Sequence, residues 1–527
     1  MARRKAPPTP VELPPLTGEQ EAVVEAVLQG QDLKVQAFAG SGKTTTLLAV
    51  ARAYLEKHPG ARVLYVTFNN RLLKEAKARF EALDASLPGT GKRRIYAFTN
   101  HGLAFHHLGW RYSDRLLSGG SLLQVRHALL ERLPSLGDFR PLLYPEDAAI
   151  IVLEALTRYM YSADARPGRE HLPELLPYVL DDPIYEPVVR ALVALMWQAW
   201  QLLSAPGELS ALPITHDVYL KTFQLMSPRL HYDLILLDEA QDANPAMLDI
   251  LLRQPAQKVC VGDAYQQIYA WRGAINAMAS LPWPSYPLTI SWRFGDAIAA
   301  YASHLLQTFL GEEAAIRGAP GKTSSVGYLA AADAVIARTN VGALREALAL
   351  LQQGKRVAFA GPLADLTDAL MAAYRLWRGY RPAYPEFAVF RSWDQLLALM
   401  QRLPAVANQY RPYVNMVEEF RDEVPRICQT VRSLVAVDAG GARRSWDVTV
   451  STAHRAKGRE WRRVRLAADW AAFYLVAFDG TVNAEEVNVA YVAATRAADA
   501  LDPGGLDEAV ERAIEMLGET VPASPFS

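Results

Sequence analysis

The chain has 527 residues, of which 51% are hydrophobic and 21% charged, and this length exceeds what one hydrophobic core usually supports. No apolar run free of charges is long enough to span a membrane, and the composition excludes wholesale disorder. The net charge of -1 gives no global attraction to polyanions, so a nucleic-acid surface has to be a local groove. We therefore expect a soluble protein of two or more domains.

The two cysteines, Cys260 and Cys428, exclude a disulfide framework, a four-thiolate zinc site and a four-thiolate iron–sulfur cluster. Residues 1–15 are basic and proline-rich, but no apolar stretch follows them as a secretory signal requires, so a flexible tail is expected. The compartment is expected to be reducing. In a bacterium this is the cytoplasm beside the nucleoid, and in a eukaryote the nucleus.

In the first half of the chain, residues 33–42 have the pattern of a strand that passes into a glycine-containing loop, and residues 44–54 continue with helical spacing. A second strand and helix are expected at 62–68 and 70–83. The leucine-rich stretch from about 101 to 226 predicts a helical insertion. Further strands are expected at 95–98, 232–238 and 258–263, the last two ending in aspartate as buried parallel strands at an active-site edge do.

After Arg293 the same alternation begins again. Strands are expected at 334–337, 356–360, 448–451 and 464–467, with a helical region that reaches to about residue 435. The pattern predicts an α/β fold with two parallel-sheet lobes, each carrying a mainly helical insertion.

Residues 37–44 (AFAGSGKT) form a phosphate-loop pattern, with alanine at the usual first glycine. The glycines let backbone N–H groups turn toward phosphate, Lys43 reaches the β and γ phosphates, and the Thr44 hydroxyl ligates Mg²⁺. The alternative is an ordinary glycine-rich turn, which the flanking strand and helix disfavour. The expected nucleotide-binding residues here are Ala39, Gly40, Ser41, Gly42, Lys43, Thr44 and Thr45.

Asp238 and Glu239 follow an apolar strand and supply the acidic groups that the phosphate loop lacks. We expect Asp238 to ligate Mg²⁺ and Glu239 to orient the attacking water. The alternative is that the pair lies in a solvent-exposed acidic turn. The apolar run that precedes the pair disfavours this alternative. Together the two motifs predict hydrolysis of a nucleoside triphosphate.

The acidic pair opens the sequence DEAQD at 238–242, which resembles a signature of superfamily 1A helicases of the UvrD/Rep kind. The other motifs of that family follow in its order. They are similar to 17–20 (TGEQ), 67–70 (TFNN), 98–102 (FTNHG), 262–273 (GDAYQQIYAWRG), 291–294 (SWRF), 452–460 (TAHRAKGRE) and 491–497 (YVAATRA). Phe38 and Arg459 depart from the family pattern, which has a glycine and an apolar residue there, but neither change removes a catalytic group.

On the nucleotide side, the resemblance implies that Gln266 and Arg293 contact the γ-phosphate and that Arg496 is an arginine finger. The implied catalytic set is Lys43, Asp238, Glu239, Gln266, Arg293 and Arg496. The further implied nucleotide contacts are Gln20 and Trp292 at the adenine, Glu460 near the ribose, and Gly458. Because these arginines fall in the second lobe and Lys43 in the first, hydrolysis is expected to be coupled to a motion of the lobes.

On the DNA side, the resemblance implies a set of single-strand contacts. They are Thr67, Phe68, Asn69, Thr99, His101, Tyr269, Trp271, Arg272, Thr452 and His454. Aromatic rings beside polar or basic residues hold unstacked bases with little sequence preference. Core packing is the alternative for each aromatic residue, and a structural hydrogen bond is the alternative for each histidine.

The resemblance covers nearly the whole chain and is closest in wording to the F-box DNA helicase branch. We expect no F-box ahead of Leu16 and no nuclease domain after the last motif. The resemblance implies two RecA-like lobes. The expected parts are a tail at 1–15, the first lobe at 16–105 and 228–290, its insertion at 106–227, the second lobe at 291–340 and 437–510, a reduced insertion at 341–436 and a tail at 511–527.

The implied activity is ATP- and Mg²⁺-dependent 3′–5′ translocation on single-stranded DNA with DNA unwinding. Two alternatives are a DNA-dependent ATPase that strips proteins from single strands with little unwinding, and a small-molecule kinase. The expected partners are single-stranded DNA and single-strand/duplex junctions. The protein is expected to be a monomer able to self-associate, with no membrane association and with loading partners that the sequence does not identify.

Overall fold

The structure is a computed structural model that describes residues 13–68, 70–88, 92–117, 129, 145–173, 183–206, 212–269, 273, 276–384, 386–403, 409–438 and 445–518. Its chain forms two compact units, the first made of Met1–Leu172 and Pro187–Thr289 and the second of Pro173–Glu186 and Ile290–Ser527. Among the described helices, none has both the length and the apolar character that crossing a membrane requires.

The first unit is built on a parallel sheet with the strand order β3-β2-β4-β5-β1-β6. Its strands are β1 (Leu33–Ala37), β2 (Val63–Thr67), β3 (Ile95–Thr99), β4 (Leu234–Asp238), β5 (Gln257–Gly262) and β6 (Ser285–Leu288). Every residue of β2 and β4 is buried, as expected for central strands of a parallel sheet that is covered on both faces. The order places β4 and β1 on either side of β5.

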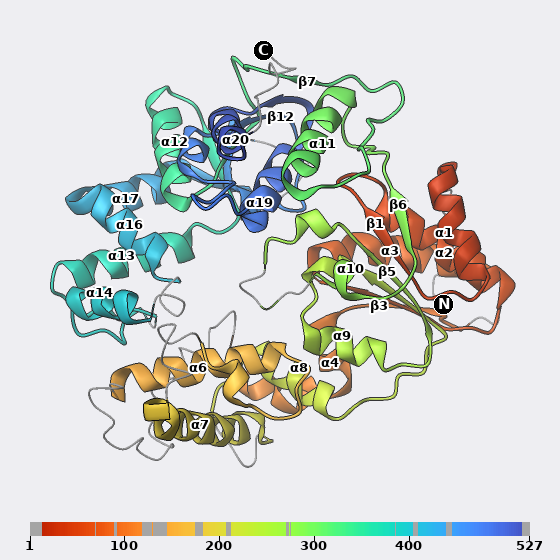
Figure 1. Ribbon diagram of the computed structural model, residues 1–527, viewed down its shortest axis with the longest axis horizontal. Helices are drawn as coiled ribbons and strands as arrows, with labels where there is room; N and C mark the ends of the chain where they lie inside the picture. Colours follow the sequence, from red (N-terminus) through yellow and green to blue (C-terminus); the bar gives the residue numbers. More distant parts are fainter. Residues whose placement is uncertain are drawn as a thin grey trace, which may run out of the picture. The chain divides into compact units, whose positions relative to one another are not determined.

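Helices cover this sheet and extend beyond it (Figure 1). They are α1 (Gly18–Leu28), α2 (Lys43–Lys57), α3 (Asn70–Ser86), α4 (Asn100–His107), α6 (Pro145–Tyr161), α7 (Glu186–Ser204), α8 (His216–Leu225), α9 (Pro245–Leu252) and α10 (Ala277–Ser280). Side chains from α1, α2 and α3, among them Val23, Leu47 and Phe80, form one core cluster with the sheet. Helix α8 contacts α4, α6 and α9, so it joins the helical insertion to the sheet-bearing part of the unit.

The second unit is built on another all-parallel sheet, with the order β10-β9-β11-β8-β12-β13-β7. Its strands are β7 (Ser325–Val326), β8 (Ala334–Ala337), β9 (Val357–Ala360), β10 (Val435–Asp438), β11 (Val448–Thr452), β12 (Trp461–Leu466) and β13 (Ala497–Asp502). Strands β8, β9 and β11 are buried along their whole length. Their apolar, β-branched composition suits the interior of a sheet covered on both faces.

The helices of the second unit include a separate group between β9 and β10. The described helices are α11 (Asp296–Leu310), α12 (Asn340–Gln352), α13 (Ala364–Trp377), α14 (Trp393–Arg402), α16 (Arg411–Phe420), α17 (Val424–Leu434), α18 (Ala453–Ala456), α19 (Ala484–Ala494) and α20 (Gly505–Met516). Figure 1 shows α13, α14, α16 and α17 gathered together, and α13 contacts both α16 and α17.

The expected fold class is confirmed, since both sheets are parallel throughout and helices alternate with strands. The predicted strand at 334–337 coincides with β8, whereas β6, β7, β10 and β13 were not predicted. Strand β9 and the first two residues of β10 lie in the range 341–436 expected for the insertion, yet both strands pair within the second sheet. Residues 511–516, expected to be tail, continue α20.

Candidate nucleotide and single-strand sites

The predicted site residues of the first unit gather at the carboxyl edge of its sheet. Because all strands are parallel, their carboxyl ends share one edge, where ligands of open α/β sheets bind. Thr99 ends β3, Thr67 ends β2 and Asp238 ends β4. Asp263 follows β5, and the phosphate loop follows β1. The sheet order therefore places Thr67 and Thr99 toward one end of this edge and the phosphate loop toward the other.

The phosphate loop has the backbone that its glycines predict. Gly40 and Gly42 have φ values of 77° and 85°, in the left-handed region that a side chain disfavours. Gly42 is the N-cap of α2 and no side chain caps that helix, so its first N–H groups remain available to an anion. The buried Ser41 hydroxyl has no hydrogen-bond partner in the described part of the chain. These polar groups fit a bound phosphate.

Lys43 and the acidic pair face one another across this loop. Lys43 Nζ lies 3.3 Å from Glu239 Oε1, and both side chains are largely buried. Burial lowers the pKa of Lys43, but the carboxylates of Glu239, Asp263 and Asp238 outweigh it, so the net pKa is raised. The lysine is therefore held in its charged form.

Asp238 is a buried carboxyl whose environment favours a cation. Burial and the neighbouring Glu239 raise its pKa to about 6, and Lys43 only partly offsets them. Its Oδ2 accepts a hydrogen bond of 2.7 Å from the Tyr65 hydroxyl, which fixes the carboxyl group at the end of β4. The carboxylate of Asp238 and the hydroxyl of Thr44, in the first turn of α2, are oxygen ligands of the kind that Mg²⁺ prefers.

Glu239 has an unusual backbone that aims its side chain into the site. Its φ of 56° is in the left-handed region, which costs a non-glycine residue about 1 kcal/mol or more. Gln241 Nε2 donates a 2.6 Å hydrogen bond to Glu239 Oε2, and Gln241 Oε1 accepts one from the Asp263 N–H. One side chain thus connects the carboxylate after β4 with the loop after β5.

Gln266 is held by the same loop. Its Nε2 donates to Asp263 Oδ2 at 2.7 Å, and its backbone N–H donates to the Asp263 carbonyl. The ring of Tyr265 stacks on Phe38, with centroids 6.2 Å apart, which gives the phenylalanine in the phosphate loop a packing role. The loop after β5 therefore contacts the phosphate loop through Tyr265. It also contacts Gln241, the residue that donates a hydrogen bond to Glu239.

Gln20 is anchored close to the start of α2. It forms a capping box with Thr17 at the start of α1. Its Nε2 donates to Thr46 Oγ1 at 3.0 Å, and that hydroxyl donates to the Gly42 carbonyl. The glutamine expected to read adenine thus lies two hydrogen bonds from the phosphate loop.

Two residues of this site were not predicted from the sequence. Tyr65 looked like an ordinary core residue of a strand, because its partner Asp238 is 173 positions away. Arg79 of α3 donates to Thr45 Oγ1 at 3.3 Å, and burial lowers its pKa, so a partly buried cation lies beside the phosphate loop. Neither residue has a local sequence signal, since each is recognised only by a long-range contact.

Within the second unit, Arg293 and Glu460 form a pair. Arg293 Nε donates to Glu460 Oε2 at 2.9 Å, and its Nη1 donates to the Thr495 carbonyl, beside Arg496. Burial raises the pKa of Glu460, but Arg293 and other cations outweigh it and lower the net value. Trp292, next to Arg293, is half-exposed, and Gly458 has a φ of 76°.

Arg496 is almost fully buried, with an exposed fraction of 1%. Its guanidinium donates to the Val492 carbonyl, the Arg459 carbonyl and Thr495 Oγ1, at 2.8, 3.3 and 3.1 Å. These bonds fix the side chain against the end of α19. The resemblance alone did not predict this degree of burial for an arginine finger.

The single-strand candidates of the first unit have mixed surroundings. The rings of Phe68 and Tyr269 stack with centroids 6.0 Å apart. Thr99 uses its hydroxyl to cap α4 by accepting from the Gly102 N–H. His101 Nε2 lies 2.9 Å from Asp217 Oδ1 of α8. This is a structural hydrogen bond, which was the alternative to DNA contact for this histidine. Thr67 is fully buried at the end of β2.

Two of the remaining candidates lie in the second unit, and the others lie outside the described residues. Thr452 is the N-cap of α18 and is buried, and His454 lies within that short helix and is partly exposed. Asn69, Trp271 and Arg272 lie outside the described residues.

A phosphate loop after one parallel strand, with an acidic pair after a second strand, is the arrangement of P-loop nucleotide-binding proteins. Comparison with known proteins supports this class. Residues 19–272 match a family model described as "AAA domain". The chain is 30% identical to "F-box DNA helicase protein 1" of Schizosaccharomyces pombe, covering 92% of this chain and 56% of the relative. It is 26% identical to "F-box DNA helicase 1" of Gallus gallus, and this match covers 96% of this chain and 50% of the relative.

These matches support the resemblance of the chain to UvrD/Rep-like helicases. The chain spans about half the length of the two curated relatives it matches.

Proposed function

We propose that this chain is an ATP-dependent motor that moves 3′ to 5′ along single-stranded DNA and unwinds DNA. The observation that carries the proposal is the arrangement at the carboxyl edge of the first sheet. Strand candidates follow β3 and β2, the loop with Gln266 follows β5, and the phosphate loop follows β1. Nucleotide chemistry and strand contact can thus be linked through one loop. The curated relatives, both named as DNA helicases, support the same assignment.

At the nucleotide, the proposed roles follow from the contacts of each side chain. Lys43 binds the β and γ phosphates, and Thr44 and Asp238 hold Mg²⁺. Mg²⁺ held by these two residues would supply positive charge that offsets the negative charge of the phosphates. Glu239, held by Gln241, orients the attacking water. Tyr65 keeps the Asp238 carboxyl in place.

Arg293 and Arg496 are proposed to stabilise the γ-phosphate from the second unit. Arg293 is preorganised by Glu460 and the Thr495 carbonyl, so little freedom is lost when it meets an anion. Arg496 donates to three oxygen acceptors of its own unit, which hold its guanidinium in place. We infer that contact of this side chain with phosphate couples hydrolysis to a conformational step.

A second candidate function is a DNA-dependent ATPase that strips proteins from single strands with little unwinding. It is favoured by the small size of the helical group between β9 and β10, which spans only Ala364–Leu434. A short insertion offers limited surface for gripping a duplex. Both candidates share every nucleotide and strand residue, so only an unwinding assay separates them.

The test measures ATP hydrolysis with single-stranded DNA, duplex DNA and RNA, followed by unwinding of duplexes that carry a 3′ or a 5′ tail. The proposal expects stimulation by single-stranded DNA and unwinding from the 3′ tail. Stimulation without unwinding supports the stripping ATPase. Hydrolysis that no nucleic acid stimulates contradicts both, and unwinding only from a 5′ tail contradicts the polarity.

A further inference from the structure

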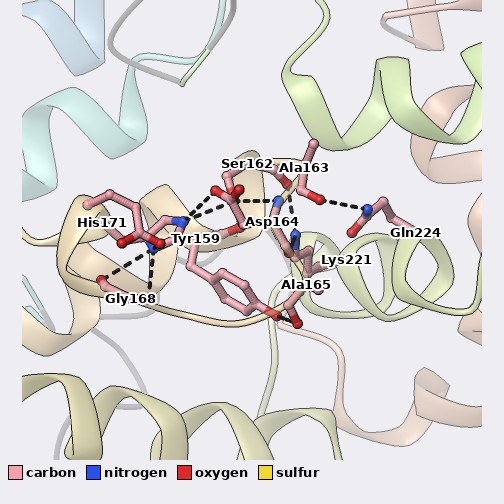
Figure 2. Close-up of polar contacts among 10 residues, drawn as sticks. Tyr159, Ser162, Ala163, Asp164, Ala165, Gly168, His171, Lys221 and Gln224 are labelled. Atoms are coloured by element: carbon pink, nitrogen blue, oxygen red, sulfur yellow. Dashed lines mark hydrogen bonds and ion pairs between the residues drawn. The ribbon is translucent and has the colours of Figure 1, made fainter.

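The helical insertion of the first unit contains a polar cluster that its own hydrogen bonds explain (Figure 2). Its members Asp164, Glu170 and His171 are residue types that can ligate a metal. However, Asp164 contacts Nε2 of the imidazole ring and Glu170 contacts Nδ1, on opposite sides of the ring, so their placement suits hydrogen bonding better than one shared ion. Lys221 of α8, which is buried, donates to the carbonyls of Ser162 and Asp164 at 2.8 and 2.6 Å. The cluster therefore holds the insertion together.

The aromatic loop of the second unit, residues 473–483, is a different kind of feature, because it presents large apolar side chains to solvent. It connects the short helix η9 (Ala468–Ala472), which follows β12, to α19. Phe478 is 87% exposed and Tyr474 is 43% exposed, and the centroids of their rings lie 5.2 Å apart. A single exposed apolar residue needs no explanation on a protein surface. Two adjoining rings on one loop, however, form a surface to which a flat, apolar group can bind.

The backbone of the aromatic loop is held in one shape. Two hydrogen bonds of 2.8 Å cross it, from the Asn483 N–H to the Leu475 carbonyl and from the Ala477 N–H to the Thr481 carbonyl. Gly480, in the turn between the bonded ends, has a φ of 82°, which a side chain would disfavour. Because the loop is already ordered, a ligand that binds to its rings has little conformational entropy to overcome.

Arg512 of α20 anchors the base of the aromatic loop. Its Nη2 donates to the carbonyls of Ala471 and Phe473 at 2.8 and 2.7 Å. The guanidinium carbon, Cζ, lies 4.7 Å from the centre of the Tyr474 ring, within the range of a cation–π contact. Tyr474 thus contacts both a cation and Phe478. Arginine beside aromatic rings is a combination that single-strand binding surfaces use.

The aromatic loop lies at the carboxyl edge of the second sheet, the edge that carries the strand-contact candidates Thr452 and His454. Strands β11, β8 and β12 are parallel neighbours in that order, so their carboxyl ends share this edge. Arg338, which follows β8, donates to Glu486 Oε2 of α19 at 2.8 Å, and its Cζ lies 4.7 Å from the centre of the Phe473 ring. These contacts keep the loop beside the end of β8.

The spacing of the strands allows one nucleic-acid strand to reach both positions. Neighbouring strands of a sheet are about 4.8 Å apart, so the ends of β11 and β12 are roughly 10 Å apart. That distance is about three nucleotides at the spacing of about 3.4 Å per nucleotide in one strand of a duplex. A single strand that contacts Thr452 can therefore extend to the aromatic loop.

The charge of the aromatic loop favours contact with bases over contact with phosphates. Asp479 is the one charged residue in the range 473–483. Hydrogen bonds from Thr481 lower the pKa of Asp479, so its carboxyl group stays ionised near neutral pH. A carboxylate beside Phe478 repels phosphate groups, whereas the neutral face of a base meets no such repulsion. Of the parts of a nucleic acid, the base is thus the one that this loop fits.

We propose that Phe478 and Tyr474 stack on unpaired bases of a single DNA strand that crosses the carboxyl edge of the second sheet. This inference rests on the proposed function, because it concerns the strand on which the motor moves. It adds a base contact to the expected set, whose members in the second unit are Thr452 and His454. Stacking tolerates any sequence because every base has a π face, so the contact suits a motor that moves along any sequence.

The first experiment measures binding of the full chain to two fluorescent oligonucleotides of equal length, followed by anisotropy. One carries bases, and the other is abasic throughout, so that only its sugar–phosphate backbone remains. Phe478→Ala should bind the normal strand about tenfold more weakly than the wild-type chain, because one stacked base is lost. The two proteins should bind the abasic strand equally.

The second experiment asks whether an aromatic ring is required. Phe478→Trp should keep the wild-type affinity for the normal strand, and Phe478→Leu, which is apolar but has no π face, should lose most of it. The dependence of the affinity on salt concentration should be the same in the wild-type chain and in all three Phe478 variants, since no phosphate contact is removed.

Tyr380→Ala is the matched control. Tyr380 is 66% exposed and belongs to the same unit, but the 14-residue helix α13 separates it from the end of β9 at the carboxyl edge. This variant should bind both oligonucleotides as the wild-type chain does. Thermal unfolding checks the fold of every variant, and Phe478→Ala should unfold at the wild-type temperature because its side chain is exposed.

The outcomes separate the inference from the function beneath it. Unchanged affinity of Phe478→Ala for the normal strand overturns the inference alone and assigns the rings to another partner. An equal loss on the abasic strand, or wild-type affinity in Phe478→Leu, also overturns it, because neither result fits stacking on a base. A wild-type chain that binds no single-stranded DNA overturns the proposed function together with this inference.

Discussion

The hydrogen bond between Tyr65 and Asp238 gives a quantitative prediction about the metal site. Replacing Tyr65 with phenylalanine removes only the hydroxyl that donates to Asp238 Oδ2 at 2.7 Å, and the ring keeps its packing on Phe80. A buried hydrogen bond to a charged group contributes about 1.5–3 kcal/mol. At about 1.4 kcal/mol for each tenfold change, loss of this bond should raise the Mg²⁺ requirement of ATP hydrolysis by about 10- to 100-fold.

The assay is ATP hydrolysis at fixed ATP and single-stranded DNA over a range of Mg²⁺ concentrations. The matched control is Tyr112→Phe, which removes another buried hydroxyl of the same unit, one that donates to the Ser204 carbonyl at 2.8 Å. The control should keep the wild-type Mg²⁺ dependence even though it also loses a hydrogen bond. An unchanged Mg²⁺ dependence in Tyr65→Phe would refute the assignment of Asp238 as a metal ligand held by Tyr65.

Three further predictions test other parts of the molecule. Lys43→Ala should reduce hydrolysis to background, because the phosphates lose their charged partner; turnover near the wild-type rate would remove Lys43 from the site. Arg496→Ala should reduce DNA-stimulated turnover by about 10³-fold or more while nucleotide binding, followed with a fluorescent analogue, persists; equal loss of binding would contradict a role confined to the transition state. Burial lowers the pKa of Lys221 from 10.5 to about 8, against the carboxylates of Asp164 and Asp249 and with the help of Arg253. The unfolded chain therefore binds more protons between these values, and the folded state should gain up to about 3 kcal/mol as the pH rises from 8 to 10.5. Urea unfolding of the wild-type chain and Lys221→Met across this range should show the gain only in the wild type, and parallel curves would contradict it.

Much of the fold could be predicted from the sequence because apolar runs and glycines indicate strands and turns within a few residues. Apolar runs that end in Asp238 and near Asp263 indicate buried parallel strands, and the structure places strands there. Gly40 and Gly42 indicate left-handed backbone, which the structure has. Strand β13 was missed because its sequence, AADALD, has neither β-branched residues nor a continuous apolar pattern. Its pairing with β12 and β7 depends on the neighbouring strands.

The candidate site divides in the same way. The phosphate loop and acidic pair were recognisable because each is a short run of residues with its chemistry in one place. The contacts of Tyr65, Arg79 and Gln241 were not, since they depend on strands and helices that meet only in the folded chain. The burial of Arg496 and the bond between His101 and Asp217 belong to this second group.

By itself, then, the sequence determined the class of fold, the order of the motifs and the chemistry available in each of them. Those properties depend on residue type and on spacing over a few positions, where backbone preference and side-chain periodicity act directly. The tertiary structure decided which groups meet: the order of strands along the first sheet, the hydroxyl that holds Asp238, and the close approach of Tyr161 to Gly273. Such meetings depend on packing between segments far apart in the chain, which no local pattern encodes.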